Sequence, residues 1–299
     1  MDEFYNQTNF NRSSDFNNSS PGDSPENING VRAVVRLLEL IIICTGLPST
    51  LLAIVAVCCL IQKDHIAPVY IINLHISDLI QLCCLTSLAM GGDPKIIECI
   101  YLFGEMASVG FMVCISLERY LVIVKPLWYR LRRDINTLVV VCLVVWMLPL
   151  IYAIPFYCDV NDEVREAIYA IYHLIPLPLF SFFLFGTIEA LSAALSVPAD
   201  EKRRIVAILV TVLLIYTLLF VPSIVWSLVE KARDSYIYSK VVFIFLNLSP
   251  LADLTMYFFI RKGIIDKLLK SLPCCKTSAD LQTNSAYIDD GSVSFDEPV

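Results

Sequence analysis

The sequence has 299 residues, of which 57% are hydrophobic and 17% are charged, and its formal net charge is −7. A soluble domain of this length would be about half apolar and about a quarter charged, so the composition excludes an ordinary soluble domain and favours a membrane protein. The acidic balance gives no reason to expect a nucleic-acid partner.

Residues 1–30 are polar and lack the apolar core of a secretory signal peptide, so we expect a disordered outer tail. The first apolar helix would then act as the insertion signal. Glycosylation sequons begin at Asn6, Asn11, Asn17 and Asn18. A tail rich in Asn and Ser also produces such triplets by chance, so these sites depend on the tail lying outside.

Seven apolar stretches follow, each long enough to cross a hydrocarbon core of about 30 Å as a helix. They lie near residues 33–61, 66–91, 96–124, 136–156, 168–196, 203–229 and 237–260. Their continuous apolar character excludes a closed β-barrel. The sequence therefore predicts an all-α membrane protein in which residues 31–260 form a seven-transmembrane helix bundle. Most of the 22 Lys and Arg residues fall on one side of it, which places that side in the cytoplasm and the N-terminus outside.

One face of the third stretch carries polar residues. Glu105 and Ser108 lie within about 40° of the direction of Arg119, because successive residues turn by about 100°. This stripe must face the protein interior, since lipid does not solvate it. Glu105, in the outer half, either pairs with a cationic ligand or is a neutral acid bonded to its neighbours. Glu39 and Lys240 either line the same cavity or reach water as rim residues.

Two carboxyl groups, Asp78 and Asp253, lie inside the second and seventh stretches. They repel each other unless a cation or hydrogen-bond donors lie between them. With the hydroxyls of Ser108 and Ser249 they could hold a small hard cation with oxygen ligands. The alternative is a protonated, hydrogen-bonded cluster without an ion.

Pro222 lies inside the sixth stretch, where it removes a backbone hydrogen bond and kinks the helix. A kinked helix can pivot, which a conformational switch requires. Beyond the seventh stretch, residues 261–275 alternate charged and apolar residues, which predicts an amphipathic interfacial helix. Cys274 and Cys275 close it as palmitoylated or unmodified thiols. Residues 276–299 form an acidic tail that we expect to be disordered.

Five of these features resemble the motifs of rhodopsin-like (class A) G-protein-coupled receptors. They are Asp78 in the second stretch, Glu118-Arg119-Tyr120 in the third, Trp146 in the fourth, Pro222 in the sixth and Asp253-Leu254-Thr255-Met256-Tyr257 in the seventh. The resemblance covers residues 33–275. Residues 126–133 are also similar to the second inner loop of Mas-related receptors, and the short third inner loop suits the branch with proton-sensing, nucleotide and lipid receptors.

The resemblance implies a plasma-membrane receptor, not an enzyme, that transmits an extracellular signal to a heterotrimeric G protein as the sixth helix moves outward. Glu118 would hold Arg119 at rest. The residues implied in the switch are Glu118, Arg119, Tyr120, Pro126, Tyr216, Phe220, Pro222 and Tyr257. Asp78, Ser108, Ser249 and Asp253 would hold a sodium ion in the inactive state, with no other cofactor. Receptor kinases and arrestin would act on the C-terminal tail, and membrane lipid would surround the bundle.

The sequence also departs from the family pattern. Thr50 stands where Asn is usual, Phe220 where Trp is usual, Leu254 where Pro is usual, and Lys202 where a carboxylate is usual. Pro94 occupies the site of the third-helix disulfide cysteine, so Cys158 lacks its normal partner and a Cys99–Cys158 bridge is the remaining option. The usual carboxylate at position 202 would pair with Arg119 and hold the inactive state. Because Lys202 cannot form that pair, we expect higher basal activity.

The ligand is the least determined feature. Glu105 favours a cationic small molecule or a peptide, and the alternatives within the family are a proton-sensing or a lipid-sensing receptor. The three histidines, His65, His75 and His173, do not cluster in the outer loops, which disfavours a histidine-based proton sensor. Outside the family, a transporter would show repeated halves, and no internal repeat is visible.

Overall fold

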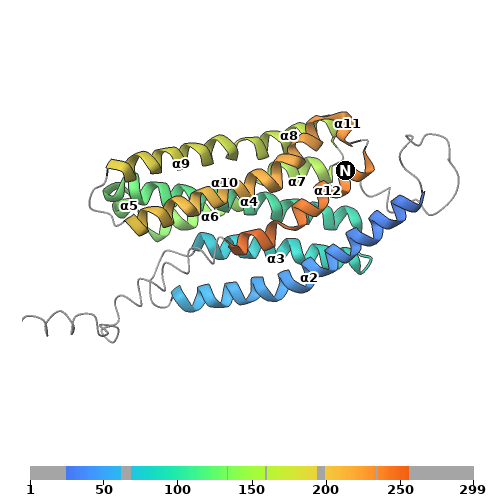
Figure 1. The fold of residues 1–299 in the computed structure, drawn as a ribbon, viewed down its shortest axis with the longest axis horizontal. Coiled ribbons are helices and arrows are strands. Elements are labelled where there is room, and N and C mark those ends of the chain that lie inside the picture. The colour runs from blue at the N-terminus through green and yellow to red at the C-terminus, as the bar shows by residue number, and fades with distance from the viewer. Residues whose placement is uncertain are drawn as a thin grey trace, which may run out of the picture. The chain divides into compact units, whose positions relative to one another are not determined.

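The computed structural model describes residues 25–61, 69–132, 134–158, 160–193, 199–233 and 235–255. These residues form helices and no strand (Figure 1). In chain order the helices are α2 (Pro25–Ile61), α3 (Val69–Ala89), α4 (Pro94–Val124), α5 (Pro126–Arg132), α6 (Ile135–Met147), α7 (Leu150–Tyr157), α8 (Asp162–Leu174), α9 (Pro176–Ala193), α10 (Ala199–Leu228), α11 (Glu230–Arg233) and α12 (Tyr236–Asn247). The predicted sequons, Tyr257, the interfacial helix, Cys274, Cys275 and the C-terminal tail lie outside the described residues.

Seven segments of the described chain are long and apolar enough to cross a membrane. They are Gly30–Cys58, Val69–Ala89, Pro94–Val124, Ile135–Tyr157, Asp162–Ala193, Ile205–Leu228 and Tyr236–Thr255. The predicted bundle is thus confirmed, and the largest difference is the fifth span, which begins at Asp162 rather than near 168. Its polar first turn is helical because the Asn161 side chain accepts a hydrogen bond from the Glu163 N–H at 3.1 Å.

Two spans are interrupted by proline. The fourth span consists of α6 and α7, which are separated at Pro149, and the fifth of α8 and α9, which are separated before Pro176. Proline lacks the N–H that would continue the helical ladder, so the ladder is interrupted at these points. Pro222, by contrast, lies within the continuous helix α10.

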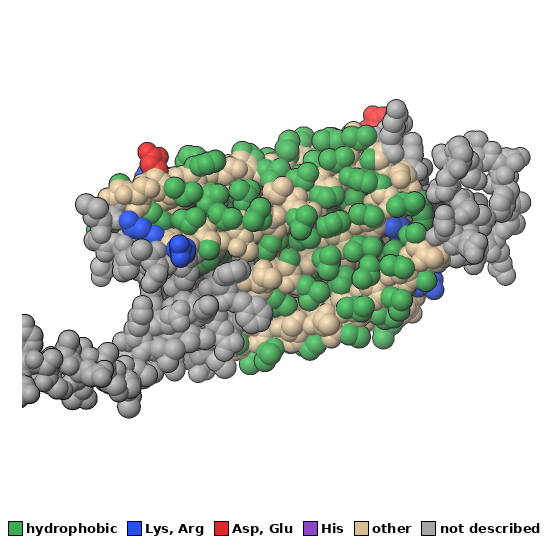
Figure 2. Space-filling model, viewed as in Figure 1, with side chains coloured by type: hydrophobic (Ala, Val, Ile, Leu, Met, Phe, Trp, Pro, Cys, Tyr) green, Lys and Arg blue, Asp and Glu red, His purple; other side chains and the backbone are tan. Residues whose placement is uncertain are grey.

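The outer surface of the bundle is apolar. Large hydrophobic side chains such as Leu52, Leu143, Phe185 and Leu218 are exposed. Figure 2 shows hydrophobic side chains across the middle of the visible face, with charged side chains near its two ends. Since a soluble protein rarely exposes so much contiguous apolar surface, this face is suited to lipid.

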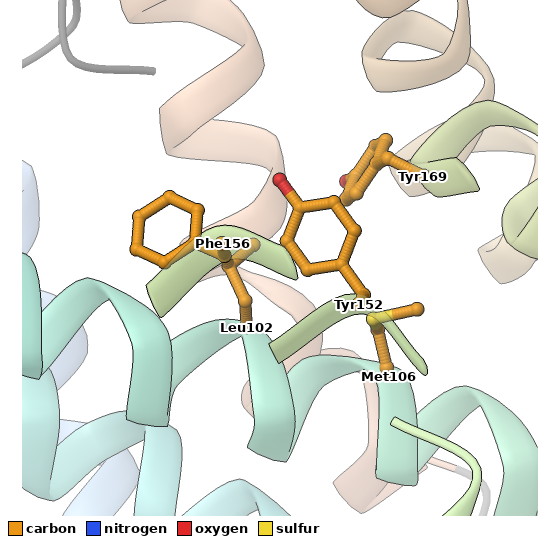
Figure 3. Packing of buried hydrophobic residues seen from close by; sticks show 5 residues of the cluster. All are labelled: Leu102, Met106, Tyr152, Phe156 and Tyr169. Carbon is orange, nitrogen blue, oxygen red and sulfur yellow. The ribbon is translucent and has the colours of Figure 1, made fainter. Parts of the chain in front are cut away.

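Helix α4 is the most buried of the seven spans and contacts α3, α6, α7, α9 and α10. It lies close to α3 at Gly104, where an added Cβ would lie 3.2 Å from the Ser77 carbonyl oxygen. Towards α7 and α8, Leu102 and Met106 pack against Tyr152, Phe156 and Tyr169, and Figure 3 shows the Tyr152 ring beside that of Tyr169. Helix α4 can therefore transmit a change at one end of the bundle to several neighbours.

Candidate functional site

A cavity of about 650 Å³ opens at the end of the bundle where α2, α4 and α12 begin, here called the cavity end. This volume is within the range of small-molecule sites. Its charged lining residues are Arg32, Arg36, Glu39, Glu98 and Lys240, and its aromatic ones are Tyr101, Tyr169, Trp226, Tyr236 and Phe243. Glu39 and Lys240, two of the predicted ligand contacts, thus line one cavity, whereas Glu105 is not among the lining residues.

Residues from α2 and α12 form one wall of this cavity. The Arg32 guanidinium donates a hydrogen bond to the Tyr236 hydroxyl at 3.3 Å, and the Lys240 ammonium lies 5.6 Å from the centroid of the same ring. Lys240 is buried, and the Glu39 carboxylate interacts electrostatically with both Lys240 and Arg36. We call Arg32, Arg36, Glu39 and Lys240 the charged wall.

Glu105 lies directly behind the cavity, fully buried. Its Oε1 atom accepts a hydrogen bond from the Tyr169 hydroxyl at 3.0 Å and lies 3.6 Å from Nε2 of His173. Tyr169 lines the cavity and therefore stands between the cavity and Glu105. Of the two interpretations that the sequence leaves open for this carboxyl group, the structure matches the one in which it is bonded to neighbouring side chains.

His173 connects this carboxyl group to α10. Its backbone carbonyl accepts a hydrogen bond from the Tyr216 hydroxyl at 2.6 Å, and its ring stacks on Phe220 with centroids 5.5 Å apart. Tyr216 and Phe220 stack on each other at 4.8 Å. Tyr169 and His173, four residues apart on one face of α8, were not identified as site residues from the sequence. Their shared helical face was the available signal, but their partner Glu105 is 64 residues from Tyr169 along the chain.

The other end of the bundle, here called the arginine end, holds Glu118-Arg119-Tyr120. The Glu118 carboxylate accepts a hydrogen bond from the Tyr129 hydroxyl of α5 at 2.6 Å. Among the described residues Glu118 makes no ion pair with Arg119, so the implied resting pair is not formed. The physical reason is that adjacent helical residues point about 100° apart.

Tyr120 lies against α9. Its ring centroid is 5.4 Å from that of Phe183 and 5.6 Å from that of Phe182. An added Cβ at Gly186 would lie 2.7 Å from the Tyr120 ring, so the absence of a side chain there makes room for Tyr120. Lys125 then ends α4, and Pro126 begins α5, as a proline at a helix start allows.

Comparison with known proteins agrees with this arrangement. Residues 49–168 match the model of the 7 transmembrane receptor (rhodopsin family). The chain is 26% identical over 288 residues to proteinase-activated receptor 2 of Rattus norvegicus, covering 80% of this chain and 71% of the relative. It is 27% identical over 221 residues to Mas-related G-protein coupled receptor member A8 of Mus musculus, covering 64% and 71%. A type-1 angiotensin II receptor of Meleagris gallopavo is 28% identical over 129 residues, covering 38% and 35%.

The chain is a G-protein-coupled receptor, and over residues 49–168 it is similar to the rhodopsin family. It is accordingly a multi-pass plasma-membrane protein that couples to G proteins and is not an enzyme. The motifs at Asp78, Glu118-Arg119-Tyr120, Trp146 and Pro222 thus lie in the spans where the sequence analysis placed them.

The receptor has a second buried polar cluster near its midplane. Asp78 is fully buried, and its Oδ2 atom lies 3.1 Å from Nδ1 of His75, one turn earlier in α3. Asp78 and Asp253 interact electrostatically. Within the described part of the chain, both carboxyl oxygens of Asp253, Oδ1 of Asp78 and the hydroxyls of Thr50 and Ser249 are buried without a hydrogen-bond partner.

Carboxyl and hydroxyl oxygens are the ligands that a small hard cation prefers, so the chemistry of these residues fits the predicted sodium site. The fourth predicted ligand, Ser108, is buried and donates its hydroxyl hydrogen to the Glu105 carbonyl at 2.7 Å, which leaves the oxygen lone pairs to accept. His75 was not predicted as part of this cluster, although its spacing of three residues from Asp78 was visible in the sequence.

Trp146 has a packing role in the receptor. Its Nε1 donates to the Asn73 side-chain oxygen at 2.9 Å, and its ring lies 5.8 Å from Phe103 and 5.5 Å from Phe111. These contacts join α6 to α3 and α4.

The Cys99–Cys158 bridge is not formed. Both are thiols in the structure, with Cys99 partly buried and Cys158 exposed. The Cys99 sulfur faces α7, where it lies 3.8 Å from the Ala153 carbonyl oxygen, whereas Cys158 caps the end of α7. The position of Cys99 inside α4, facing a helix rather than a loop, accounts for the difference.

Proposed function

We propose that the receptor binds its ligand in the cavity and passes the signal through α4 and α8 to α10. The observation that carries this proposal is the continuous run of contacts from Tyr169 on the cavity wall, through Glu105 and His173, to Phe220. A ligand that displaces Tyr169 would alter the support of Phe220. Packed elements move between discrete arrangements, so such a change would shift α10 as a unit.

Movement of α10 would centre on Pro222. This residue removes one hydrogen bond from the helical ladder, and its carbonyl accepts a hydrogen bond from the Tyr238 hydroxyl of α12 at 3.0 Å. The part of α10 beyond Pro222 is thus held by α12, while the part near the arginine end is the one that swings outward. The opened end would receive a heterotrimeric G protein at Arg119 and Tyr120, with Tyr257 as a further member of the switch.

The cavity end would face the extracellular side. The arginine end carries basic residues: Lys125 follows α4 there, and Lys202 and Arg203 lie in the first turns of α10. Under the positive-inside rule this supports a cytoplasmic position for the arginine end. The N-terminal sequons would then be outside. The C-terminal tail would be inside, where receptor kinases and arrestin act, and Cys274 and Cys275 would anchor it to the membrane by palmitoylation.

In the inactive receptor a sodium ion would be held by Asp78, Ser108, Ser249 and Asp253. The support for this is the set of buried oxygen atoms that the described residues leave without a hydrogen-bond partner. A cation there reduces the repulsion between the two carboxylates and favours the state that keeps them close.

The test uses G-protein dissociation sensors covering all α-subunit classes, in cells with matched surface levels of receptor. Wild type is compared with Arg119→Ala and with Leu88→Trp, which places an indole in the cavity. Leu52→Trp, on an exposed face of α2, is the matched control. We expect Arg119→Ala to abolish activation, and Leu88→Trp but not Leu52→Trp to alter it. A cavity variant that behaves like its control would contradict the proposal.

A further inference from the structure

We infer that the cavity takes an amphiphile with an anionic headgroup, seated against the charged wall. This inference rests on the proposed function, because it assumes that the cavity is the ligand site. It differs from the cationic ligand that Glu105 favours in the sequence.

The balance of charge on the charged wall is the first observation. Three of its residues, Arg32, Arg36 and Lys240, are cationic, and only Glu39 is acidic. The remaining charged lining residue, Glu98, lies on α4 rather than on α2 or α12. An anion near the wall therefore meets more cations than carboxylates.

The burial of Lys240 is the second observation. Its side chain is only 8% exposed, and its ammonium group lies against the Tyr236 ring inside the cavity. In a region of low dielectric the charge of a buried ammonium attracts an anion more strongly than it would in water. Arg32 lies beside it and presents a planar guanidinium, which suits a carboxylate or phosphate.

The rest of the cavity is mostly apolar, with Glu98, Ser223 and three tyrosines as its polar members. Leu85, Leu88, Ile97, Leu102, Trp226 and Phe243 supply side chains without charge. A volume of about 650 Å³ accommodates a short acyl or aryl body in addition to a headgroup. The combination of one cationic wall and an apolar remainder matches an amphiphile better than a fully polar ligand such as a sugar.

Glu105 does not provide the opposite preference. It is fully buried, is not among the lining residues, and is bonded to Tyr169 with His173 close by. A cationic ligand would first have to displace the Tyr169 hydroxyl. Its charge would also meet three lining cations against the two lining carboxylates of Glu39 and Glu98.

The experiment uses four probes that share one alkyl chain: dodecanoate, dodecyl phosphate, dodecanol and dodecylamine. Their binding to the full-length receptor in lipid nanodiscs is measured as the shift in thermal unfolding temperature against probe concentration. We expect the carboxylate or the phosphate to stabilise the receptor and the alcohol and the amine to do so at least about tenfold less strongly. The stronger of the two anions distinguishes a fatty-acid source from a phospholipid source.

Substitutions in the charged wall provide the second part of the experiment. We expect Lys240→Gln to weaken binding of the anionic probe by about 30-fold, and Lys240→Arg to restore most of it. Lys95→Gln removes a cation that lies near the same end but does not line the cavity, so it should leave binding unchanged. The inference is overturned if dodecylamine binds as tightly as the anions, if neither anion binds, or if Lys240→Gln binds like wild type.

Leu88→Trp separates the two proposals. If it blocks the probes while charge has no influence, the cavity remains the ligand site and only the anionic preference fails. If an anionic probe binds wild type and Leu88→Trp equally, the probe binds elsewhere and the inference fails; the cavity also fails as the ligand site only if G-protein activation in Leu88→Trp matches that in Leu52→Trp.

Discussion

Two carboxyl groups of the receptor, those of Glu105 and Asp78, are each buried beside a different histidine. The two carboxyl–histidine pairs differ in what surrounds them. Glu105 has the Tyr169 hydroxyl at 3.0 Å and His173 at 3.6 Å, and this pair contacts the aromatic residues of α10. Asp78 has His75 at 3.1 Å but faces a second carboxyl group, Asp253, whose oxygens have no hydrogen-bond partner among the described residues. The first pair is a mechanical connection, whereas in the second two carboxyl groups repel each other, an arrangement that suits a cation.

The largest expected effect is that substitutions in the two pairs change the stability of the receptor in opposite directions. Glu105→Leu removes the acceptor from Tyr169 and the neighbour of His173, so it should destabilise the receptor by about 3 kcal/mol. Asp253→Asn removes a repulsive charge next to Asp78, so without sodium it should be neutral or stabilising. Thermal unfolding of the two purified variants in choline chloride measures both. If both variants lost a similar amount of stability, the two clusters would contribute equally to folding, which would contradict the proposed difference.

The second effect concerns sodium. Replacing choline by sodium at ten times the dissociation constant should stabilise wild type by about 1.4 kcal/mol, because only the folded state has the site. Asp253→Asn should lose this effect, since it replaces a carboxylate ligand with a neutral amide. Glu105→Gln is the matched control and should retain it. A sodium shift that survives in Asp253→Asn would place the ion elsewhere.

The third effect is at the arginine end. Tyr129→Phe removes the hydroxyl that donates to Glu118 at 2.6 Å, a contact worth about 1 kcal/mol or more. If this contact holds the inactive arrangement of α4 and α5, its loss should raise basal G-protein activation by about fivefold. Phe182, an exposed residue of α9, packs beside Tyr120, so Phe182→Leu serves as the control for altered packing at the same end. Unchanged basal activation in Tyr129→Phe would remove the contact from the switch.

The smallest effect is expected for the cysteines. Because Cys99 and Cys158 are thiols, Cys158→Ser should change stability by no more than about 0.5 kcal/mol, and a reducing agent should leave the unfolding temperature unchanged. Cys44→Ser, an exposed thiol in α2, is the reference. A drop of several degrees on reduction would show that a bridge forms in the cell.

The sequence was sufficient for features that depend on local composition. Span positions follow from runs of apolar residues, and the burial of Asp78, Glu105 and Asp253 follows because lipid cannot solvate them. The position of Pro222 inside the sixth span, where its missing N–H removes one hydrogen bond of the ladder, can also be read from the sequence. All of these can be read without knowing which helices touch.

The partners of the buried groups could not be read in the same way. Glu105 meets Tyr169 at a separation of 64 residues, and Tyr216 meets His173 at a separation of 43. The sequence analysis considered the histidines only as a proton sensor in the outer loops, whereas His75 and His173 each lie beside a buried carboxyl group. The charged wall similarly joins α2 to α12, the first and last spans.

The most direct test separates binding from activation in a receptor without the His173 ring. Binding of dodecanoate or dodecyl phosphate, whichever is tighter, and the G-protein response to it are measured in wild type and His173→Leu at equal surface density. His173 does not line the cavity but contacts Phe220, so binding should stay within about threefold while the response falls by about tenfold or more. A variant that binds and responds like wild type would contradict transmission through Glu105 and His173 to α10.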